Sequence, residues 1–235
     1  MSFRQHIPNV ITCGNLVSGC FSILFSFSGM PVVAAIMIFV AGLFDFFDGF
    51  TARLLDAHSS IGADLDSLSD MVSFGVAPGF IMYRLIYEGM AEPIWPLGNV
   101  SLFACLAFLL PVFSAVRLAK FNVDTRQTTS FIGLPTPPMA IFMASLPLAF
   151  WQKGLLGQPV LNPYLCLGIV MLFSVLMVCN LPFFSFKMKT ASWKGNEVRW
   201  IFLILAVAGF AVFRFVALPF ILLAYMLMSI LFYRP

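Results

Sequence analysis

Long apolar stretches recur along the whole chain, and they constrain its fold more than any other feature. A helix needs about 20 mostly apolar residues to cross the hydrocarbon core of a bilayer. On that measure we expect eight spans: 9–28, 31–55, 60–88, 99–122, 136–152, 163–183, 197–213 and 216–233. The last two are short and meet at Phe213-Arg214-Phe215, so we expect a tight hairpin there; a count of seven spans is the alternative.

The composition excludes other classes of protein. With 61% hydrophobic and 10% charged residues, the chain is too apolar for a soluble domain or a disordered one. The net charge of +3 is small and the basic residues are scattered, which argues against a nucleic-acid partner. We therefore expect an all-α polytopic membrane protein, a single domain over 1–235, with a short interfacial helix before the first span.

Charge placement predicts the orientation in the membrane. With eight spans both termini lie on one side, and ten of the 13 Lys and Arg residues fall there, all except Arg84, Lys153 and Arg214. Positive residues accumulate on the cytoplasmic side of membrane proteins. We expect a multi-pass protein of the cell membrane with cytoplasmic termini.

Acidic residues cluster where the second and third spans meet. Six of the ten Asp and Glu residues lie in one window of 26 residues: Asp45, Asp48, Asp56, Asp64, Asp66 and Asp70. Asp45 and Asp48 are three residues apart, and Asp66 and Asp70 four apart, so each pair occupies one helix face. A short connection makes the two helices antiparallel neighbours, and the two pairs then face each other near the cytoplasmic surface. Asp56 and Asp64 lie off these faces, and we expect them to cap helices or meet solvent.

Four facing carboxylates repel one another and are costly to desolvate, so cations are needed between them. Ligation by oxygen alone favours Mg²⁺ or Mn²⁺ over zinc or copper. Such a site can hold two ions about 4 Å apart, an arrangement suited to phosphoryl transfer. Gly49 and Gly62 leave room for a phosphate or a backbone, and Arg53 offers a fork-shaped donor for phosphate. A cation path in a transporter is the alternative from another class, but it explains neither the glycines nor Arg53.

The acidic window resembles the signature of the CDP-alcohol phosphotransferase family, DxxDGxxARx8Gx3Dx3D. Every fixed position matches: Asp45, Asp48, Gly49, Ala52, Arg53, Gly62, Asp66 and Asp70. The segments 66–78, 133–138 and 185–187 and the early Ile7-Pro8-Asn9 resemble the phosphatidylserine synthases of this family. Together these segments extend the resemblance over about 180 residues.

The resemblance implies a metal-dependent enzyme that transfers a phosphatidyl group from CDP-diacylglycerol to an alcohol and releases CMP. It favours L-serine as the acceptor, with glycerol phosphate or inositol phosphate as the alternatives. It also implies a homodimer embedded in membrane lipids, with one site in each protomer.

The resemblance further assigns roles to the residues of the motif. Asp45, Asp48, Asp66 and Asp70 are implied as ligands of two Mg²⁺ or Mn²⁺ ions, and Asp70 also as the base that accepts the proton of the attacking hydroxyl. The residues implied to bind the CDP-lipid are Asp45, Asp48, Gly49, Ala52, Arg53, Gly62 and Asp66.

The acceptor site has to be sought among cations, because serine carries a carboxylate. Arg117 and Lys120 lie three residues apart at the cytoplasmic end of the fourth span, where both can face one cavity. Lys187 is a further candidate on the same side of the membrane. The competing interpretation is that these residues contact lipid headgroups.

Overall fold

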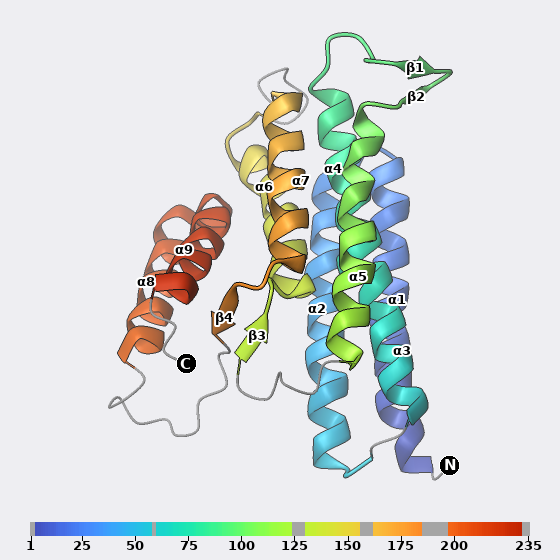
Figure 1. The fold of residues 1–235 in the computed structure, drawn as a ribbon, viewed down its shortest axis with the longest axis vertical. Coiled ribbons are helices and arrows are strands. Elements are labelled where there is room, and N and C mark those ends of the chain that lie inside the picture. The colour runs from blue at the N-terminus through green and yellow to red at the C-terminus, as the bar shows by residue number, and fades with distance from the viewer. Residues whose placement is uncertain (1–2, 58–59, 124–129, 156–161, 185–196, 232–235) are drawn as a thin grey trace.

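The structure is a computed structural model that describes residues 3–57, 60–123, 130–155, 162–184 and 197–231. The described part is dominated by helices, several of which run nearly parallel to the long axis of the molecule (Figure 1). The helices are α1 Phe3–Phe27, α2 Pro31–Leu54, α3 Ser60–Asp70, α4 Ala77–Glu88, α5 Leu109–Val123, α6 Thr136–Gln152, α7 Pro163–Val178, α8 Glu197–Phe213 and α9 Ala217–Leu231. Shorter elements are the π-helical segment η1 Met71–Val76, the 3₁₀ segments η2 Ala104–Phe108 and η3 Arg214–Val216, and the strands β1 Pro96–Leu97, β2 Val100–Ser101, β3 Ser130–Ile132 and β4 Pro182–Phe184.

Helices α1 and α2 form a long antiparallel hairpin. The turn between them contains Gly29 at φ 74°, a conformation that glycine adopts without steric cost. Pro31 then begins α2, where a missing backbone N–H does no harm because the first turn has no intrahelical partner for it. Across the hairpin the Ser22 hydroxyl donates a hydrogen bond of 2.8 Å to the carbonyl oxygen of Ala34.

A stripe of small and polar side chains runs along the buried face of α1. Its described members are all nearly inaccessible to solvent: Thr12, Asn15, Ser18, Ser22 and Ser26. Small residues at a membrane helix interface allow backbones to approach closely. The hydroxyls of Thr12 and Ser18 donate to carbonyl oxygens of α1 itself, whereas Ser22 and Asn15 donate across the interface. This face of α1 packs against α2 and also against α3, η1 and α4.

The closest approach along this stripe occurs at Gly19, which packs against the π-helical segment. A Cβ atom on Gly19 would lie 2.8 Å from the Cα of Ser73 and 3.0 Å from its backbone nitrogen. The Ser73 hydroxyl donates a hydrogen bond of 2.9 Å to the carbonyl oxygen of Asn15. Contact with the backbone of η1 therefore requires a residue without a side chain at position 19.

The apolar core lies where α2, α4, α6 and α7 meet. Its largest fully buried side chains include Ile38, Phe74, Met82, Met143 and Phe173. The rings of Phe142 on α6 and Phe173 on α7 stack with their centroids 4.3 Å apart. β3 and β4 pair in antiparallel fashion beside this core. In the chain, β3 lies between α5 and α6, and β4 lies between α7 and α8.

Helices α8 and α9 form a second hairpin beside α6, and Figure 1 shows the pair set apart from the long helices. Its turn contains Arg214 at φ 51°. The Gln152 side chain at the end of α6 holds this turn: its amide donates to the carbonyl oxygen of Phe213 (3.1 Å), and its oxygen accepts from the backbone N–H of Phe215 (2.8 Å).

An all-helical membrane fold is confirmed. Four described stretches are long and apolar enough to cross a membrane, and α7 is a shorter apolar helix. The four stretches are His6–Phe27, Pro31–Leu54, Ala104–Val123 and Arg199–Ser229. The last stretch contains the α8–α9 hairpin expected from the sequence, while eight separate crossings remain a prediction.

Three boundaries differ from the sequence prediction. The described residues before position 9 do not form a separate interfacial helix, since α1 runs without interruption from Phe3. The fourth predicted span becomes helical only at Ala104, because residues 96–101 pair as β1 and β2. The sixth ends at Val178 instead of 183, because the chain leaves the helix to form β4.

The contact at Gly19 makes a prediction about stability. We expect Gly19→Ala to destabilise the protein by about 1–3 kcal/mol, because the added methyl group has to displace the backbone of Ser73. Gly42→Ala in α2 is the matched control, since a Cβ there would have nothing within 4 Å. Thermal unfolding in detergent measures both, and equal melting temperatures for the two variants would contradict the close approach.

Candidate functional site

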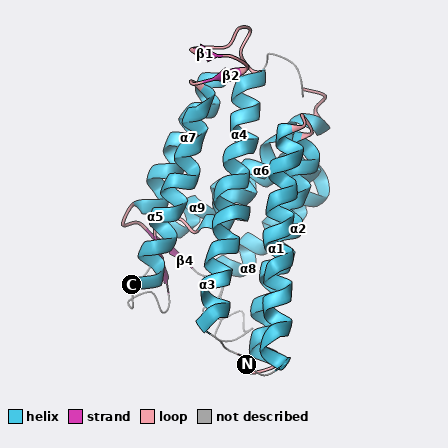
Figure 2. Cartoon of the chain, turned by 90° about the vertical axis from the view of Figure 1, so that its right-hand side faces the viewer, coloured by secondary structure: helices cyan, strands magenta, loops and turns pink. Residues whose placement is uncertain are grey.

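The acidic residues of the motif lie near one end of the helix bundle. The end of α2, the start of α3 and the start of α1 lie together there, as both views show (Figure 1, Figure 2). Carboxylate oxygens of Asp45, Asp48 and Asp66 lie within 4.8 Å of one another. The two sequence segments that carry these residues therefore supply a single site, as their spacing on the helices predicted.

The three carboxylates concentrate negative charge at a site where Asp48 is buried and Asp45 and Asp66 are partly buried. Asp48 is only 6% exposed, and its Oδ2 atom is buried without a hydrogen-bond partner in the described structure. Among the described residues no lysine or arginine forms an ion pair with any of the three. Buried carboxylates without counter-charges are strongly unfavourable.

This donor set fits a hard divalent cation. Carboxylate oxygens are the ligands that Mg²⁺ and Mn²⁺ prefer, and here three residues converge with one buried oxygen left unpartnered. Asp45, Asp48 and Asp66 are the residues that would hold such an ion.

Asp70, the fourth residue of the predicted set, lies one helical turn beyond Asp66, outside the group of three. Its Oδ1 atom accepts a hydrogen bond of 3.2 Å from the side-chain amide of Asn15. The charges of Asp45 and Asp66 act on Asp70, and so does that of Arg117 on α5. Asp70 thus stands at the inner edge of the acidic group, where α3 passes into η1. Interruptions of this π-helical kind often occur at functional sites.

A pocket of about 240 Å³ opens beside the acidic group, between α1, α2 and α3. Six of the seven residues predicted to bind a CDP-lipid line it: Asp48, Gly49, Ala52, Arg53, Gly62 and Asp66. The seventh, Asp45, joins Asp48 and Asp66 in the acidic group. The pocket thus combines two carboxylates and an arginine with small residues, and α2 and α3 each contribute both a carboxylate and small residues.

Gly49 contributes open space to this pocket. The nearest atom to a Cβ on Gly49 would be Nη1 of Arg53 at 3.8 Å, which is ordinary contact with a flexible side chain. Helix packing therefore does not require glycine here, in contrast to Gly19. The missing side chain leaves room where a ligand could lie against the α2 backbone.

The three predicted acceptor-site cations have different surroundings. Arg117 is buried, 7% exposed, and its guanidinium lies over the ring of Phe121 at 4.9 Å. Lys120 is exposed. Neither lines the pocket beside Asp48, and Lys187 lies outside the described residues. Of the two candidates that the structure describes, Arg117 is the one for which an electrostatic interaction with Asp70 is found.

Sequence reasoning missed the contribution of α1. Pro8, Asn9 and Thr12 line the pocket, and Asn15 holds Asp70. A signal was present, because polar residues at positions 9, 12 and 15 repeat with helical spacing inside an apolar stretch. The sequence segment Ile7-Pro8-Asn9 indicated the family but not its position. The packing of α1 places Pro8 and Asn9 beside the acidic residues.

Comparisons with known proteins agree with this arrangement. The family model for CDP-alcohol phosphatidyltransferases matches residues 5–186, which include nearly all of α1, the whole acidic motif and Arg117. The chain is similar to a CDP-diacylglycerol–serine O-phosphatidyltransferase of Helicobacter pylori, with 34% identity over 182 residues, 77% of this chain and 72% of that protein.

Two further relatives extend the likeness. A CDP-diacylglycerol–serine O-phosphatidyltransferase of Bacillus subtilis is 32% identical over 197 residues, 83% of this chain and 99% of its own length. An archaetidylserine synthase of Methanothermobacter thermautotrophicus is 34% identical over 152 residues, 63% of this chain and 60% of its own length. The match of the family model over most of the chain shows that this protein belongs to the CDP-alcohol phosphatidyltransferase family.

Proposed function

We propose that this protein is a CDP-diacylglycerol–serine O-phosphatidyltransferase, which makes phosphatidylserine and CMP from a CDP-linked lipid and L-serine. The observation that carries the proposal is the convergence of Asp45, Asp48 and Asp66 beside a pocket whose lining matches the family motif. The preference for serine rests on the relatives from Helicobacter pylori and Bacillus subtilis. The alternative acceptors are glycerol phosphate and inositol phosphate, and the CMP-release assay described below compares them with serine.

The reaction replaces the phosphoanhydride bond of the diphosphate by a phosphoester bond to serine. The serine hydroxyl oxygen forms a bond to the phosphorus that carries the diacylglycerol, and the bond from that phosphorus to the oxygen of CMP breaks. The hydroxyl proton passes to a base, and CMP leaves with the electron pair of the broken bond. Catalysis of this kind depends on holding donor and acceptor in line and on stabilising the charge of the leaving group.

Asp45, Asp48 and Asp66 would hold Mg²⁺ or Mn²⁺, and Asp70 would complete the site for a second ion. When bound, such ions neutralise the negative charge of the diphosphate. Arg53 adds a donor for a phosphate oxygen, and Gly49, Ala52 and Gly62 leave space for the nucleotide.

Asp70 is the proposed base for the serine hydroxyl, which is a weak nucleophile at neutral pH. The hydrogen bond from Asn15 occupies Oδ1 of Asp70 and fixes the orientation of the carboxylate. Oδ2 of Asp70 is then the atom that would accept the proton. Arg117, buried and under the influence of the Asp70 charge, is the proposed partner of the serine carboxylate.

The proposal includes the membrane arrangement. The acidic end of the bundle would face the cytoplasm, with both termini on that side and eight crossings in total. A homodimer with one site per protomer is part of the same proposal, and native mass measurement of the purified protein tests it.

The first functional prediction concerns the acidic group. Asp45→Asn, Asp48→Asn or Asp66→Asn should each lower turnover more than about 100-fold, a loss of about 2.7 kcal/mol in transition-state stabilisation, because each removes a metal-ligand charge. The assay is release of CMP from CDP-diacylglycerol in detergent with a panel of alcohols. EDTA should abolish the activity, and Mg²⁺ or Mn²⁺ should restore it where Zn²⁺ does not.

Asp56→Asn is the matched control for these variants. Asp56 lies in the same acidic window but adopts φ 47° in the turn after α2, a conformation that asparagine tolerates well. Its turnover should stay near wild type. Wild-type turnover in any of the three site variants would refute the metal assignment, and activity that needs an ion gradient would favour a transporter.

A second prediction separates ligand space from helix packing. Gly49→Leu should weaken CDP-lipid binding about tenfold or more while changing the melting temperature little, because the added side chain enters the pocket and not the core. Gly42→Leu on the same helix is the control, since it also points into open space but away from the pocket. If the two substitutions affected CDP-lipid binding equally, Gly49 would not be a residue that leaves space for the CDP-lipid.

The third functional prediction concerns the acceptor. Arg117→Gln should raise the KM for serine by about tenfold to a hundredfold with CDP-lipid binding nearly unchanged, because it removes a buried charge-assisted hydrogen bond to the acceptor. Lys120→Gln, at an exposed position, should have a much smaller effect. Arg117→Lys keeps the charge, so this variant distinguishes loss of the charge from a folding defect. Parallel loss of serine use and CDP-lipid binding would place Arg117 in the phosphate site instead.

A further inference from the structure

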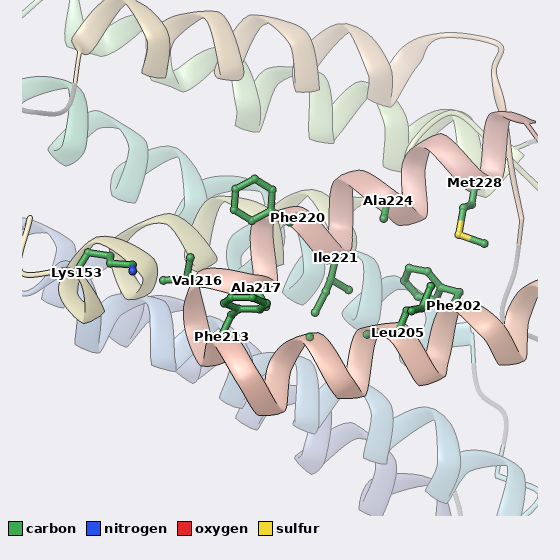
Figure 3. A pocket seen from close by; sticks show the side chains of 12 residues that line it. Lys153, Phe202, Leu205, Phe213, Val216, Ala217, Phe220, Ile221, Ala224 and Met228 are labelled. Atoms are coloured by element: carbon green, nitrogen blue, oxygen red, sulfur yellow. The ribbon is translucent and has the colours of Figure 1, made fainter.

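A second, larger cavity lies far from the acidic group, between α8 and α9. Its volume is about 540 Å³, within the range of ligand sites in proteins. Figure 3 shows apolar side chains of both helices converging on it, with Lys153 at one end. Its apolar lining includes Phe202 and Phe213 on α8 and Phe220 and Met228 on α9.

Small residues keep this cavity open. Ala206 and Gly209 on α8 and Ala217 and Ala224 on α9 line it, yet a Cβ on Gly209 would have no atom within 4 Å. At Gly19 the missing side chain lets two backbones touch, whereas at Gly209 it leaves a gap. The helices of this hairpin are therefore separated by a groove along part of their length.

The groove has one polar end. Lys153 is the single charged residue of its lining, and Figure 3 shows its nitrogen directed along the groove toward Val216. Lys153 is exposed and forms no ion pair with any residue that the structure describes. Trp151, 55% exposed, and Arg214 in the hairpin turn lie at the same end of α6 and α8. Tryptophan and basic residues in this combination are typical of a membrane–water interface.

The position of the groove is fixed by the body of the protein. The two hydrogen bonds of Gln152 tie the α8–α9 turn to the end of α6, so Lys153, the next residue, is held at the mouth of the groove. In Figure 1, α6 ends near the end of the bundle opposite to the one where α2 ends. The groove with Lys153 is thus separate from the site that contains Asp48.

From this geometry we infer that the groove binds one anionic phospholipid, with an acyl chain between α8 and α9 and its phosphate at Lys153. The apolar lining matches a hydrocarbon chain, and the unpaired ammonium matches a phosphate at the level where the headgroups lie. A single basic residue close to the membrane surface can attract an anionic headgroup. A helix from a second copy fits less well, because it would have to bring a carboxylate to Lys153 against an otherwise apolar wall.

The test measures lipid retention on the full-length protein in detergent and does not depend on catalysis. Native mass spectrometry follows phosphatidylglycerol and phosphatidylcholine with identical acyl chains, each added separately. Wild-type protein should retain phosphatidylglycerol in preference to phosphatidylcholine. Lys153→Gln should reduce the retention of phosphatidylglycerol about fivefold, as expected for one basic residue near a headgroup, and should leave phosphatidylcholine unchanged.

Filling the groove tests the position of the acyl chain. Gly209→Leu should remove retention of both lipids, and Ala224→Leu, from the facing helix, should do the same if Gly209→Leu fails to fold. Gly168→Leu on the exposed face of α7 is the matched control, because a Cβ there also has nothing within 4 Å. Its lipid retention should equal that of wild type.

Three results would overturn the inference. The first is equal retention of the two lipids with no effect of Lys153→Gln. The second is wild-type retention in the groove-filling variants. The third is conversion of a dimer to a monomer by Gly209→Leu without loss of lipid, which would identify the groove as a protein interface. None of these results bears on the transferase proposal, since the measurement involves neither CDP-lipid nor serine.

Discussion

Mutual repulsion of three carboxylates is the constraint on which the arrangement of this protein depends. Asp45, Asp48 and Asp66 bring their oxygens within 4.8 Å of one another at the end of an apolar helix bundle. No arginine or lysine among the described residues pairs with them, so a bound cation would relieve the repulsion. The unfavourable charge is thus the same feature that can hold metal ions against a diphosphate.

Helix α1 positions the acidic group. Its polar face packs against α2, α3 and η1, and close approach at Gly19 sets how near α3 and η1 can lie. Asn15 links α1 to both α3 and η1. Its side-chain amide donates to Asp70, and its backbone carbonyl oxygen accepts from the Ser73 hydroxyl. These two hydrogen bonds tie α1 to α3 and η1, which favours one arrangement of the helices over alternatives.

The molecule separates the polar acidic pocket from an apolar groove between α8 and α9. Around the acidic pocket, small residues leave space for a charged ligand, whereas between α8 and α9 they leave space lined by hydrocarbon. Both spaces depend on missing side chains, at Gly49 and Gly209, where no backbone contact demands glycine. The contrast with Gly19 indicates that glycine has two different uses in these helices.

The sequence by itself determined the helical membrane class, the α8–α9 hairpin and the meeting of the two acidic segments, because these follow from apolar length and helical spacing. It did not determine that α1 joins the site, since a helix reveals its polar face but not the neighbour against which that face packs. The sequence did not distinguish the environments of Arg117 and Lys120. Tertiary packing buries Arg117 and leaves Lys120 exposed. The groove at Lys153 likewise depends on how far apart α8 and α9 lie, a distance set by side chains that meet across helices and by the Gln152 hydrogen bonds.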